Sequence, residues 1–335
     1  MNSKNHLAHL SGSILVTGAT GSFGQQFVKT ILERFQPERL VVFSRDELKQ
    51  FEMQQNPAFA TERLRYFLGD VRDVERLKMA MRGVDVVIHA AALKQVPAAE
   101  YNPFECIRTN VHGAENIVQA AIATNVKRVI ALSTDKACNP INLYGASKLA
   151  SDKIFIAGNN LAGEGGPRFS VVRYGNVVGS RGSVVGYFKD LVARGEKSLP
   201  ITDLRMTRFW ITLQQGVDFV VSSVQSMRGG ELFIPKIPSM RIVDLAEAVA
   251  PGMPTHVVGI RPGEKIHEIM VSEDDARTTL ELADQYIIEP AFPFWNRDHL
   301  TDGGAVPVAD GFSYRSDTNA KWIEPDALRM IIDKA

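Results

Sequence analysis

Strand-like and helix-like segments alternate through the first half of this chain of 335 residues, and that alternation limits how it can fold. Short apolar and β-branched runs are expected to form strands at Ser13–Val16, Leu40–Phe43, Arg65–Leu68, Val84–His89 and Arg128–Leu132, and later at Phe169–Arg173 and Glu231–Ile234. Amphipathic stretches between them are expected to form helices at Phe23–Phe35, Glu47–Met53, Val74–Met81 and Thr109–Ala123. The sequence therefore predicts an α/β fold with a doubly wound parallel sheet and helices on both faces.

The second half of the chain is less regular. Glycine and proline interrupt the alternation, beginning with Gly175–Gly186. We expect residues 1–175 to form the larger domain and residues 211–240 to return to it. We expect a smaller, discontinuous α/β lobe, which closes over the edge of the sheet, to be assembled from residues 176–210 and 241–335.

Charge and hydropathy exclude several kinds of partner. The 38 Lys and Arg residues balance 38 Asp and Glu residues, which argues against nucleic acid as the main partner. The N-terminal segment lacks an apolar signal region. No run approaches the roughly 18 apolar residues that cross a bilayer. We therefore expect a cytoplasmic protein with no membrane partner.

The cysteines and histidines point to no metal site. Cys106 and Cys138 have no paired spacing, so neither a disulfide framework nor a cysteine-based zinc site is expected. A catalytic thiol is one interpretation of Cys138, but no base lies nearby in the sequence, which favours a small apolar filler. His89 and His267 are expected to be packed or hydrogen-bonded, since no metal-ligand spacing surrounds either.

A glycine-rich turn follows the first expected strand. In the segment Ile14–Gly24, an apolar strand leads into Gly-x-x-Gly-x-x-Gly and then a helix. Gly18 permits the tight turn, Gly21 lets the backbone approach a pyrophosphate, and Gly24 lets the helix pack near the strand. The pyrophosphate then lies on free N–H groups at the positive end of that helix. The motif predicts a Rossmann-like dinucleotide site made by Thr17, Gly18, Thr20, Gly21, Ser22, Phe23 and Gly24.

The end of the second expected strand favours NADP over NAD. An acidic residue there would hold the ribose 2′-hydroxyl of NAD, whereas basic residues accommodate the 2′-phosphate of NADP. Ser44 and Arg45 come first in this chain, and Lys49 lies one turn on. The alternative is that Asp46 caps the next helix and Arg45 is a solvated charge. Further cofactor contacts are expected from Asp70, Val71, Ala90 and Ala92.

Tyr144 and Lys148 are spaced i, i+4, so on a helix they share one face. There a lysine ammonium favours the ionised phenol, the base that alcohol oxidation on a nicotinamide needs. Thr134, Asp135 and Lys136 lie just upstream, and oxidation alone does not require the Asp–Lys pair. Such a pair in a loop is usually solvated, but its position after an apolar strand favours catalysis. We predict that the chain oxidises a substrate and then acts further on the ketone.

These motifs resemble those of the extended short-chain dehydrogenase/reductases. The glycine pattern, Asp70, Asn110 and the Tyr144–Lys148 pair carry this resemblance. Longer segments resemble the inverting UDP-N-acetylglucosamine 4,6-dehydratases, which open the route to pseudaminic acid, a sugar of flagellins and bacterial surfaces. These segments are residues 44–49, 89–97, 133–137, 173–183, 206–210 and 261–265. The resemblance covers nearly the whole chain, thinning before Ser13 and after about Pro290.

The resemblance implies a mechanism with tightly bound, recycled NADP. Tyr144, its pKa lowered by Lys148 and the nicotinamide charge, takes the proton of the sugar C4 hydroxyl during oxidation, and Thr134 hydrogen-bonds that oxygen. Lys136 is the expected C5 base, which requires that desolvation or a cationic neighbour lower its pKa. Asp135 is the acid that helps the C6 hydroxyl to leave. Hydride then returns to C6, and reprotonation from the opposite face inverts C5.

The same resemblance implies UDP-N-acetylglucosamine as the substrate of the smaller lobe. Lys94 would reach the sugar and Asn176 the diphosphate region, while Arg208 and Arg261 would neutralise pyrophosphate oxygens. Glu264 would accept a hydrogen bond from the uridine ribose. Further substrate contacts are expected from Thr134, Tyr144, Val177 and Thr202. For Arg208 an ordinary ion pair, and for Glu264 a helix cap at Lys265, are the alternatives. A homo-oligomer, dimer or hexamer, is also implied.

Two other functions remain as alternatives. An NDP-sugar 4-epimerase needs Tyr144 but has no use for Asp135 and Lys136. A non-catalytic NADP-binding module is the alternative from another class. The presence of Asn110 and Thr134 beside the tyrosine and lysine disfavours it, because so many reactive groups are expected to share one cleft.

Overall fold

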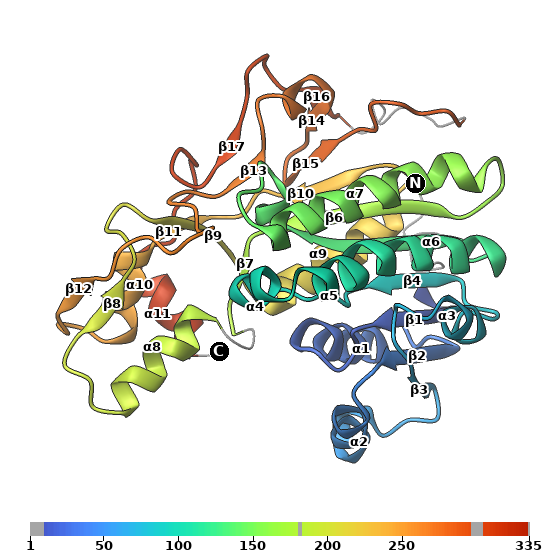
Figure 1. The fold of residues 1–335 in the computed structure, drawn as a ribbon, viewed down its shortest axis with the longest axis horizontal. Coiled ribbons are helices and arrows are strands. Elements are labelled where there is room, and N and C mark those ends of the chain that lie inside the picture. Colours follow the sequence, from blue (N-terminus) through green and yellow to red (C-terminus); the bar gives the residue numbers. More distant parts are fainter. Residues whose placement is uncertain (1–9, 180–182, 296–303, 334–335) are drawn as a thin grey trace.

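Within the described residues, a sheet of ten strands forms the centre of the molecule (Figure 1). The computed structural model describes residues 10–179, 183–295 and 304–333, so Ser180–Gly182 of the motif at 173–183 lie outside the described part. Seven strands run parallel, in the order β3 (Leu64–Leu68), β2 (Arg39–Ser44), β1 (Ser13–Thr17), β4 (Val86–His89), β5 (Arg128–Thr134), β6 (Arg168–Tyr174) and β10 (Leu232–Pro235). The strand order reverses between β1 and β4, the point at which doubly wound sheets bind their ligands.

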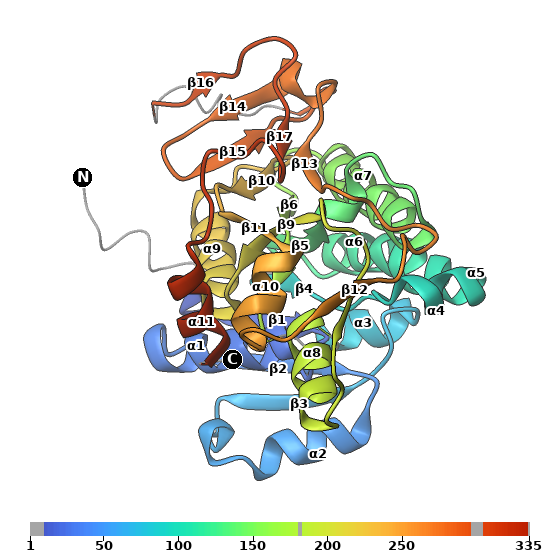
Figure 2. The same cartoon turned by 90° about the vertical axis from the view of Figure 1, so that its left-hand side faces the viewer.

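Helices cover both faces of the sheet, as Figure 2 shows. On one face α1 (Ser22–Arg34) packs against α9 (Leu213–Ser226), and on the other α6 (Gly113–Ala123) packs against α3 (Val74–Ala80) and α7 (Leu143–Ala162). The shorter elements here are α2 (Glu47–Gln55), α4 (Val96–Tyr101), α5 (Pro103–Ile107) and the 3-10 turns η2 (Pro57–Phe59) and η4 (Asp135–Ala137). The predicted doubly wound α/β fold is confirmed, with most element ends within one or two residues of those expected.

The helix predicted at Thr109–Ala123 begins as a π-helical turn. Residues Arg108–His112 (η3) are π-helical and continue directly into α6. This turn holds the buried Asn110, whose amide donates to the carbonyl oxygen of Leu93 at 2.9 Å and accepts from its N–H at 2.8 Å. The π turn therefore fixes the loop that follows β4, beside the switch point of the sheet, and such turns often occur at functional sites.

The structure differs from the expected lobe at three short strands late in the chain. There β15 (Gln285–Ile288), β14 (Thr279–Glu281) and β16 (Val306–Pro307) extend the large sheet antiparallel from β10. The sequence boundary assigned these residues to the smaller lobe, but their backbone pairs with the large sheet. The physical reason is that β10 would otherwise present an open edge of N–H and C=O groups.

The smaller lobe has a hydrophobic core of its own. It contains α8 (Val184–Ala193), α10 (Ile242–Val249), α11 (Pro325–Asp333) and the parallel pair β8 (Leu199–Ile201) and β12 (Thr255–Val257), seen at the left of Figure 1. Strand β9 (Thr207–Ile211) pairs with β7 (Asn176–Val177) and β11 (Ser239–Arg241). It joins the two cores, because Trp210 packs in that of the lobe and Phe209 and Ile211 pack in the main one.

Further short elements lie between α10 and α11. These are β13 (Ile269–Val271), which pairs antiparallel with β17 (Tyr314–Arg315), and the 3-10 turn η5 (Asp275–Thr278). Throughout the described ranges, no helix combines the length and apolar character that crossing a membrane requires.

Candidate active site

The glycine-rich turn leads from β1 into α1 at the switch point. Gly18 has a φ of +65°, and a Cβ there would lie 2.9 Å from the backbone nitrogen of Ala91. A Cβ on Gly24 would collide with the backbone of Ala19, so glycine is needed for α1 to approach this closely. Among the described side chains none caps α1 at Gly21, and its first turn carries no acidic residue. The positive end of α1, which no described side chain caps, fits a dinucleotide pyrophosphate.

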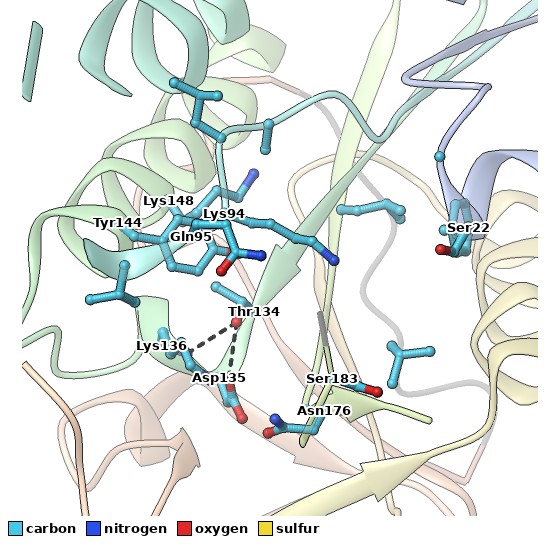
Figure 3. Close-up of a pocket in the computed structure, with 18 of the residues that line it drawn as sticks. Ser22, Lys94, Gln95, Thr134, Asp135, Lys136, Tyr144, Lys148, Asn176 and Ser183 are labelled. Carbon is cyan, nitrogen blue, oxygen red and sulfur yellow. Dashed lines mark hydrogen bonds and ion pairs between the residues drawn. The ribbon is translucent and has the colours of Figure 1, made fainter. Parts of the chain in front are cut away.

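This turn opens into a cleft of about 1330 Å³ that also reaches the smaller lobe. The volume exceeds that of ordinary pockets for one small ligand. The predicted residues that line it are Gly18, Thr20, Gly21, Ser22, Phe23, Gly24, Ser44, Arg45, Lys49, Asp70, Val71, Ala90, Ala92, Lys94, Thr134, Asp135, Lys136, Tyr144, Lys148, Asn176, Val177, Thr202, Arg208, Arg261 and Glu264. Figure 3 shows Tyr144 and Lys148 on one side of the cleft and Ser22 on the other.

Thr17 is the predicted cofactor residue that the cleft does not expose. Its side chain is fully buried, and its hydroxyl accepts from the backbone nitrogens of Ala90 and Ala91 at 3.1 and 3.2 Å. The same hydroxyl therefore donates to Nδ1 of His89, 2.9 Å away. Burial lowers the pKa of His89 to about 3, so the imidazole is neutral. Thr17 thus holds strand ends together beneath the cleft, and His89 is the packed, hydrogen-bonded histidine that was expected.

Arg45 and Lys49 line the end of the cleft at β2. Arg45 is 57% exposed, with its guanidinium 3.9 Å from the carboxylate of Asp70. Lys49 pairs with Asp46 at 2.7 Å, and Asp46 caps α2 by accepting from the backbone nitrogen of Lys49. The helix cap considered as the alternative is therefore present, and both cations still face the cleft.

The catalytic candidates meet where β5 ends and α7 begins (Figure 3). Thr134 ends the strand, Asp135 and Lys136 form η4, and Tyr144 and Lys148 lie in the first turns of the helix. The Thr134 hydroxyl donates to Oδ1 of Asp135 at 2.9 Å and accepts from the backbone nitrogen of Lys136 at 3.3 Å. The acid, the phenol and Lys148 are all buried. Such a concentration of buried titratable groups in a cleft is typical of catalytic sites.

The Lys136 ammonium contacts two buried carboxylates. Its Nζ lies 3.0 Å from Oδ1 of Asp135 and 3.3 Å from Oε1 of Glu268. Burial disfavours the ammonium, but the two carboxylates outweigh it and raise the pKa of Lys136 above its ordinary value. The base role expected from the sequence requires a lowered pKa, and the structure gives the opposite direction. Asp135 is the larger of the two raising influences, and Glu268, which the local sequence does not bring near Lys136, adds to it.

Tyr144 is likewise held in its protonated form, which for a phenol is the neutral one. Burial raises the pKa of its phenol to about 12, while the Lys136 ammonium and the Thr134 hydroxyl act in the opposite direction. The sequence assigned the lowering influence to Lys148. Burial lowers the pKa of Lys148 itself, and the nearby carboxylate of Asp152 acts on this pKa in the opposite direction. In this structure, therefore, Lys136 is the main cation that favours the phenolate.

A buried ion pair between Arg173 and Asp152 is hydrogen-bonded to Ser133, the residue before Thr134. Arg173 of β6 places a guanidinium nitrogen 3.3 Å from Oδ2 of Asp152, which also accepts from the Ser133 hydroxyl at 2.7 Å. Arg173 donates in addition to the backbone carbonyl of Met270 at 3.0 Å. These bonds join β5, β6, α7 and β13 directly beneath Thr134.

Cys138 follows this segment and is buried. Burial raises the pKa of its thiol to about 11, which disfavours the thiolate that a nucleophile requires. Its backbone carbonyl accepts from Nζ of Lys265 at 2.6 Å. These observations support the apolar-filler interpretation.

Arg208 lies in the cleft wall with its guanidinium turned to the protein. It donates to the backbone carbonyls of Thr207, Ile266 and Lys265 at 2.8–3.0 Å. It also contacts the carboxylates of Glu264 at 3.4 Å and Glu268 at 3.7 Å. The ion pair considered as the alternative for Arg208 is therefore present, and it organises the loop before β13.

The other substrate candidates surround the same loop. Arg261 is exposed, and burial lowers the pKa of Lys94. Glu264 pairs with Arg208, and no helix begins at Lys265 within this described segment, so the helix-cap alternative for Glu264 is not realised. The loop is tied to α7 because the side-chain amide of Asn142 donates to the carbonyl of Gly263 at 2.7 Å.

Sequence reasoning missed two groups that the cleft brings together with the catalytic candidates. Glu268 and Lys265 both line it. Burial lowers the pKa of Lys265. Lys265 was noted only as part of the segment 261–265, and nothing in the sequence around Glu268 distinguishes it from a surface glutamate. Only tertiary contact with Lys136 identifies it.

Gly145 is where a one-carbon change should disturb the site most directly. A Cβ there would collide with the backbone carbonyl of Lys136. We expect Gly145→Ala to displace Lys136, to destabilise the fold by about 1–3 kcal/mol, and to lower turnover by about a hundredfold. Thermal unfolding and steady-state kinetics measure the two effects.

Gly216→Ala is the matched control. Gly216 also lies within a helix, α9, but a Cβ there would meet nothing within 4 Å. We expect this variant to keep full activity and to gain up to about 1 kcal/mol of stability. Equal behaviour of the two variants would contradict the close approach of α7 to the Lys136 backbone.

Comparisons with known proteins show the family of this chain. A family model described as "Polysaccharide biosynthesis protein" matches residues 14–290. The chain is 57% identical over 326 residues to an inverting UDP-N-acetylglucosamine 4,6-dehydratase of Campylobacter jejuni, covering 96% of this chain and 97% of the relative. It is 42% identical to a UDP-glucose 4-epimerase of Rickettsia prowazekii, covering 96% of each chain. Among solved structures, Pen from Bacillus thuringiensis superimposes with a TM-score of 0.87 at 34% identity, covering 97% of this chain and 98% of Pen.

Proposed function

This chain belongs to the polysaccharide biosynthesis protein family, and we propose that it is an inverting UDP-N-acetylglucosamine 4,6-dehydratase. The observation that carries the proposal is the cluster of Thr134, Asp135, Lys136 and Tyr144 in one cleft with the glycine-rich turn. Oxidation at C4 needs only the tyrosine. The adjoining acid and lysine supply what elimination of water across C5 and C6 needs in addition.

The chain's own residues divide the reaction among themselves. The glycine-rich turn would hold a nicotinamide cofactor, NADP in our proposal, which would take up the C4 hydride and return it at C6. Tyr144 takes the proton of the C4 hydroxyl, and Thr134 hydrogen-bonds that oxygen. Lys136, as the neutral amine, then removes the C5 proton, which the 4-ketone acidifies. Asp135, after its carboxylate has taken up a proton from water in the cleft, protonates the departing C6 hydroxyl.

The proposed product is UDP-2-acetamido-2,6-dideoxy-β-L-arabino-hex-4-ulose, formed as C5 is reprotonated from the opposite face. We propose that this is the first step of pseudaminic acid biosynthesis, carried out by a cytoplasmic homo-oligomer. We propose that the UDP-sugar contacts six residues that line the cleft: Lys94, Asn176, Val177, Thr202, Arg261 and Glu264.

Proton NMR of the purified protein with UDP-N-acetylglucosamine in D2O tests the proposal. We expect a new 6-deoxy methyl signal, deuterium at C5 and the L-arabino configuration, without added reductant. The same methyl signal with retained C5 geometry would contradict the inverting assignment. No methyl signal would contradict dehydration altogether.

A 4-epimerase is the second candidate, because the Rickettsia relatives at about 42% identity carry that name. An epimerase would convert the same substrate to its galacto isomer and form no methyl group. The NMR spectrum therefore separates the two functions in a single sample.

The choice of NADP predicts a role for Arg45. We expect Arg45→Ala to weaken NADP binding by about 10–100-fold, since a charge-assisted hydrogen bond contributes about 1.5–3 kcal/mol. Binding of NAD, which has no 2′-phosphate, should change little. Competition between NADP and NAD for each purified variant measures the ratio of the two dissociation constants. Lys29→Ala, which removes an exposed cation from α1, is the control. Equal weakening for NADP and NAD would contradict the assignment.

A further inference from the structure

Glu268 is a buried carboxylate that none of the roles above has used. It precedes β13 and is 2% exposed. Its backbone nitrogen donates to Oγ of Ser316, and its carbonyl accepts from the backbone nitrogen of Ser316, both at 2.9 Å. Oγ of Ser316 also lies 2.7 Å from Oγ1 of Thr207 in β9. The backbone of Glu268 is therefore fixed from two sides.

The Glu268 side chain reaches two cations. Its Oε1 lies 3.3 Å from Nζ of Lys136 and 3.7 Å from Nε of Arg208. Its Oε2 is buried and has no hydrogen-bond partner among the described residues, and the same is true of Oδ2 of Asp135. Lys136 thus lies between two buried carboxylates, each with one oxygen left unpaired. Removing either carboxylate would remove a full negative charge from its surroundings.

We propose that Glu268 is a positioning residue for the dehydration: it holds the Lys136 ammonium in the cleft and sets the pH at which this lysine becomes the C5 base. The inference rests on the proposed function, because it concerns the base that removes the C5 proton. The Lys136 side chain is 26% exposed and lines the cleft, so the proton it loses passes to water there. The resulting amine then takes the C5 proton, and Glu268 stabilises the ammonium that forms again.

Other charged groups facing Lys136 come from every element packed against it. Asp135 of η4 and Glu268 favour the ammonium, whereas burial and Arg208 of β9 oppose it. Tyr144 of α7 and Lys265 of the loop before β13 also interact with its charge. Arg208 is itself fixed to three backbone carbonyls, so it keeps Glu268 in place. Removing the charge of Glu268 leaves Asp135 as the remaining carboxylate on Lys136.

Glu268→Gln tests this role, because it removes the charge and keeps the shape of the side chain. The rate of deuterium incorporation at C5 is measured against pH at saturating UDP-N-acetylglucosamine. Because Lys136 must be neutral to act, the rate rises with pH. We expect the rising limb to move about 1–3 pH units lower in Glu268→Gln, the usual effect of one opposite charge at this distance.

Two further variants make the result specific. Glu268→Asp keeps the charge but draws it back from Lys136, so we expect a smaller shift in the same direction. This variant also decides the question if Glu268→Gln does not fold, which circular dichroism reports. Glu281→Gln removes a carboxylate that pairs with Lys236 at 2.7 Å outside the cleft, and its pH profile should match that of the unaltered protein.

The folded variants could instead show a lower rate at every pH, with the rising limb of the pH–rate profile at the same pH as in the unaltered protein. That result would overturn the proposal and leave Glu268 a purely structural residue. A limb that moves to higher pH would overturn it as well. Failure of the proposed function has a different signature, because the unaltered protein would then form no 6-deoxy product at any pH.

Discussion

Replacing Lys136 with arginine is expected to lower the rate of UDP-N-acetylglucosamine dehydration by about 10²–10⁴-fold, the range that one general base contributes. The guanidinium keeps the positive charge between Asp135 and Glu268, so the fold is preserved. It stays protonated at all accessible pH values and therefore does not act as a base. Oxidation at C4 depends on Tyr144 and should persist, visible as a change of nicotinamide absorbance on mixing with the sugar nucleotide.

Lys136→Met tests the same role without the charge. It should be equally inactive and also less stable, because two buried carboxylates then lack their cation. Lys127→Met is the control, since Lys127 pairs with Asp85 at 2.7 Å but is 74% exposed. Formation of the 4-keto-6-deoxy product at the normal rate by either Lys136 variant would show that another group is the C5 base.

Arg173→Met is expected to lower the free energy of unfolding by about 3–5 kcal/mol, the usual cost of leaving one partner of a buried ion pair alone. Arg173 and Asp152 are almost fully buried, with a nitrogen–oxygen distance of 3.3 Å. Burial raises the pKa of Asp152 even with Arg173 present. In the variant the folded state therefore takes up a proton more readily than the unfolded state. The loss of stability should consequently narrow as the pH falls. Urea unfolding at several pH values measures this.

The controls compare the stability cost of breaking a buried ion pair with that of breaking an exposed one. Arg34→Met breaks an exposed pair with Asp218 and should cost about 1 kcal/mol or less. The double variant Arg173→Met with Asp152→Asn should recover much of the lost stability, because no unpaired charge then remains buried. A cost for Arg173→Met no larger than that for Arg34→Met would contradict the importance of the pair.

Most of the large sheet could be predicted because its signals are local. The parallel strands are continuous apolar runs, and the helices between them have their own amphipathic periodicity. The antiparallel extension could not be predicted in the same way. Strand β14 has three residues and β15 has four, too short for a periodic pattern to identify. Their place in the large sheet depends on pairing with the edge strand β10, which is a tertiary contact.

The candidate site likewise has features that depend on residues close in the sequence and features that depend on tertiary contacts. The glycine-rich turn and the Tyr144–Lys148 pair could be found because backbone approach and helical spacing depend on residues a few positions apart. The protonation of Lys136 could not be found this way. The base role requires a lowered pKa, whereas the carboxylates of the neighbouring Asp135 and of Glu268, far along the chain, together raise it. The sequence by itself thus identified the glycine-rich turn and the catalytic candidates of β5 and α7. Only the tertiary structure brought Glu268 to Lys136, because electrostatic interaction depends on distance in space.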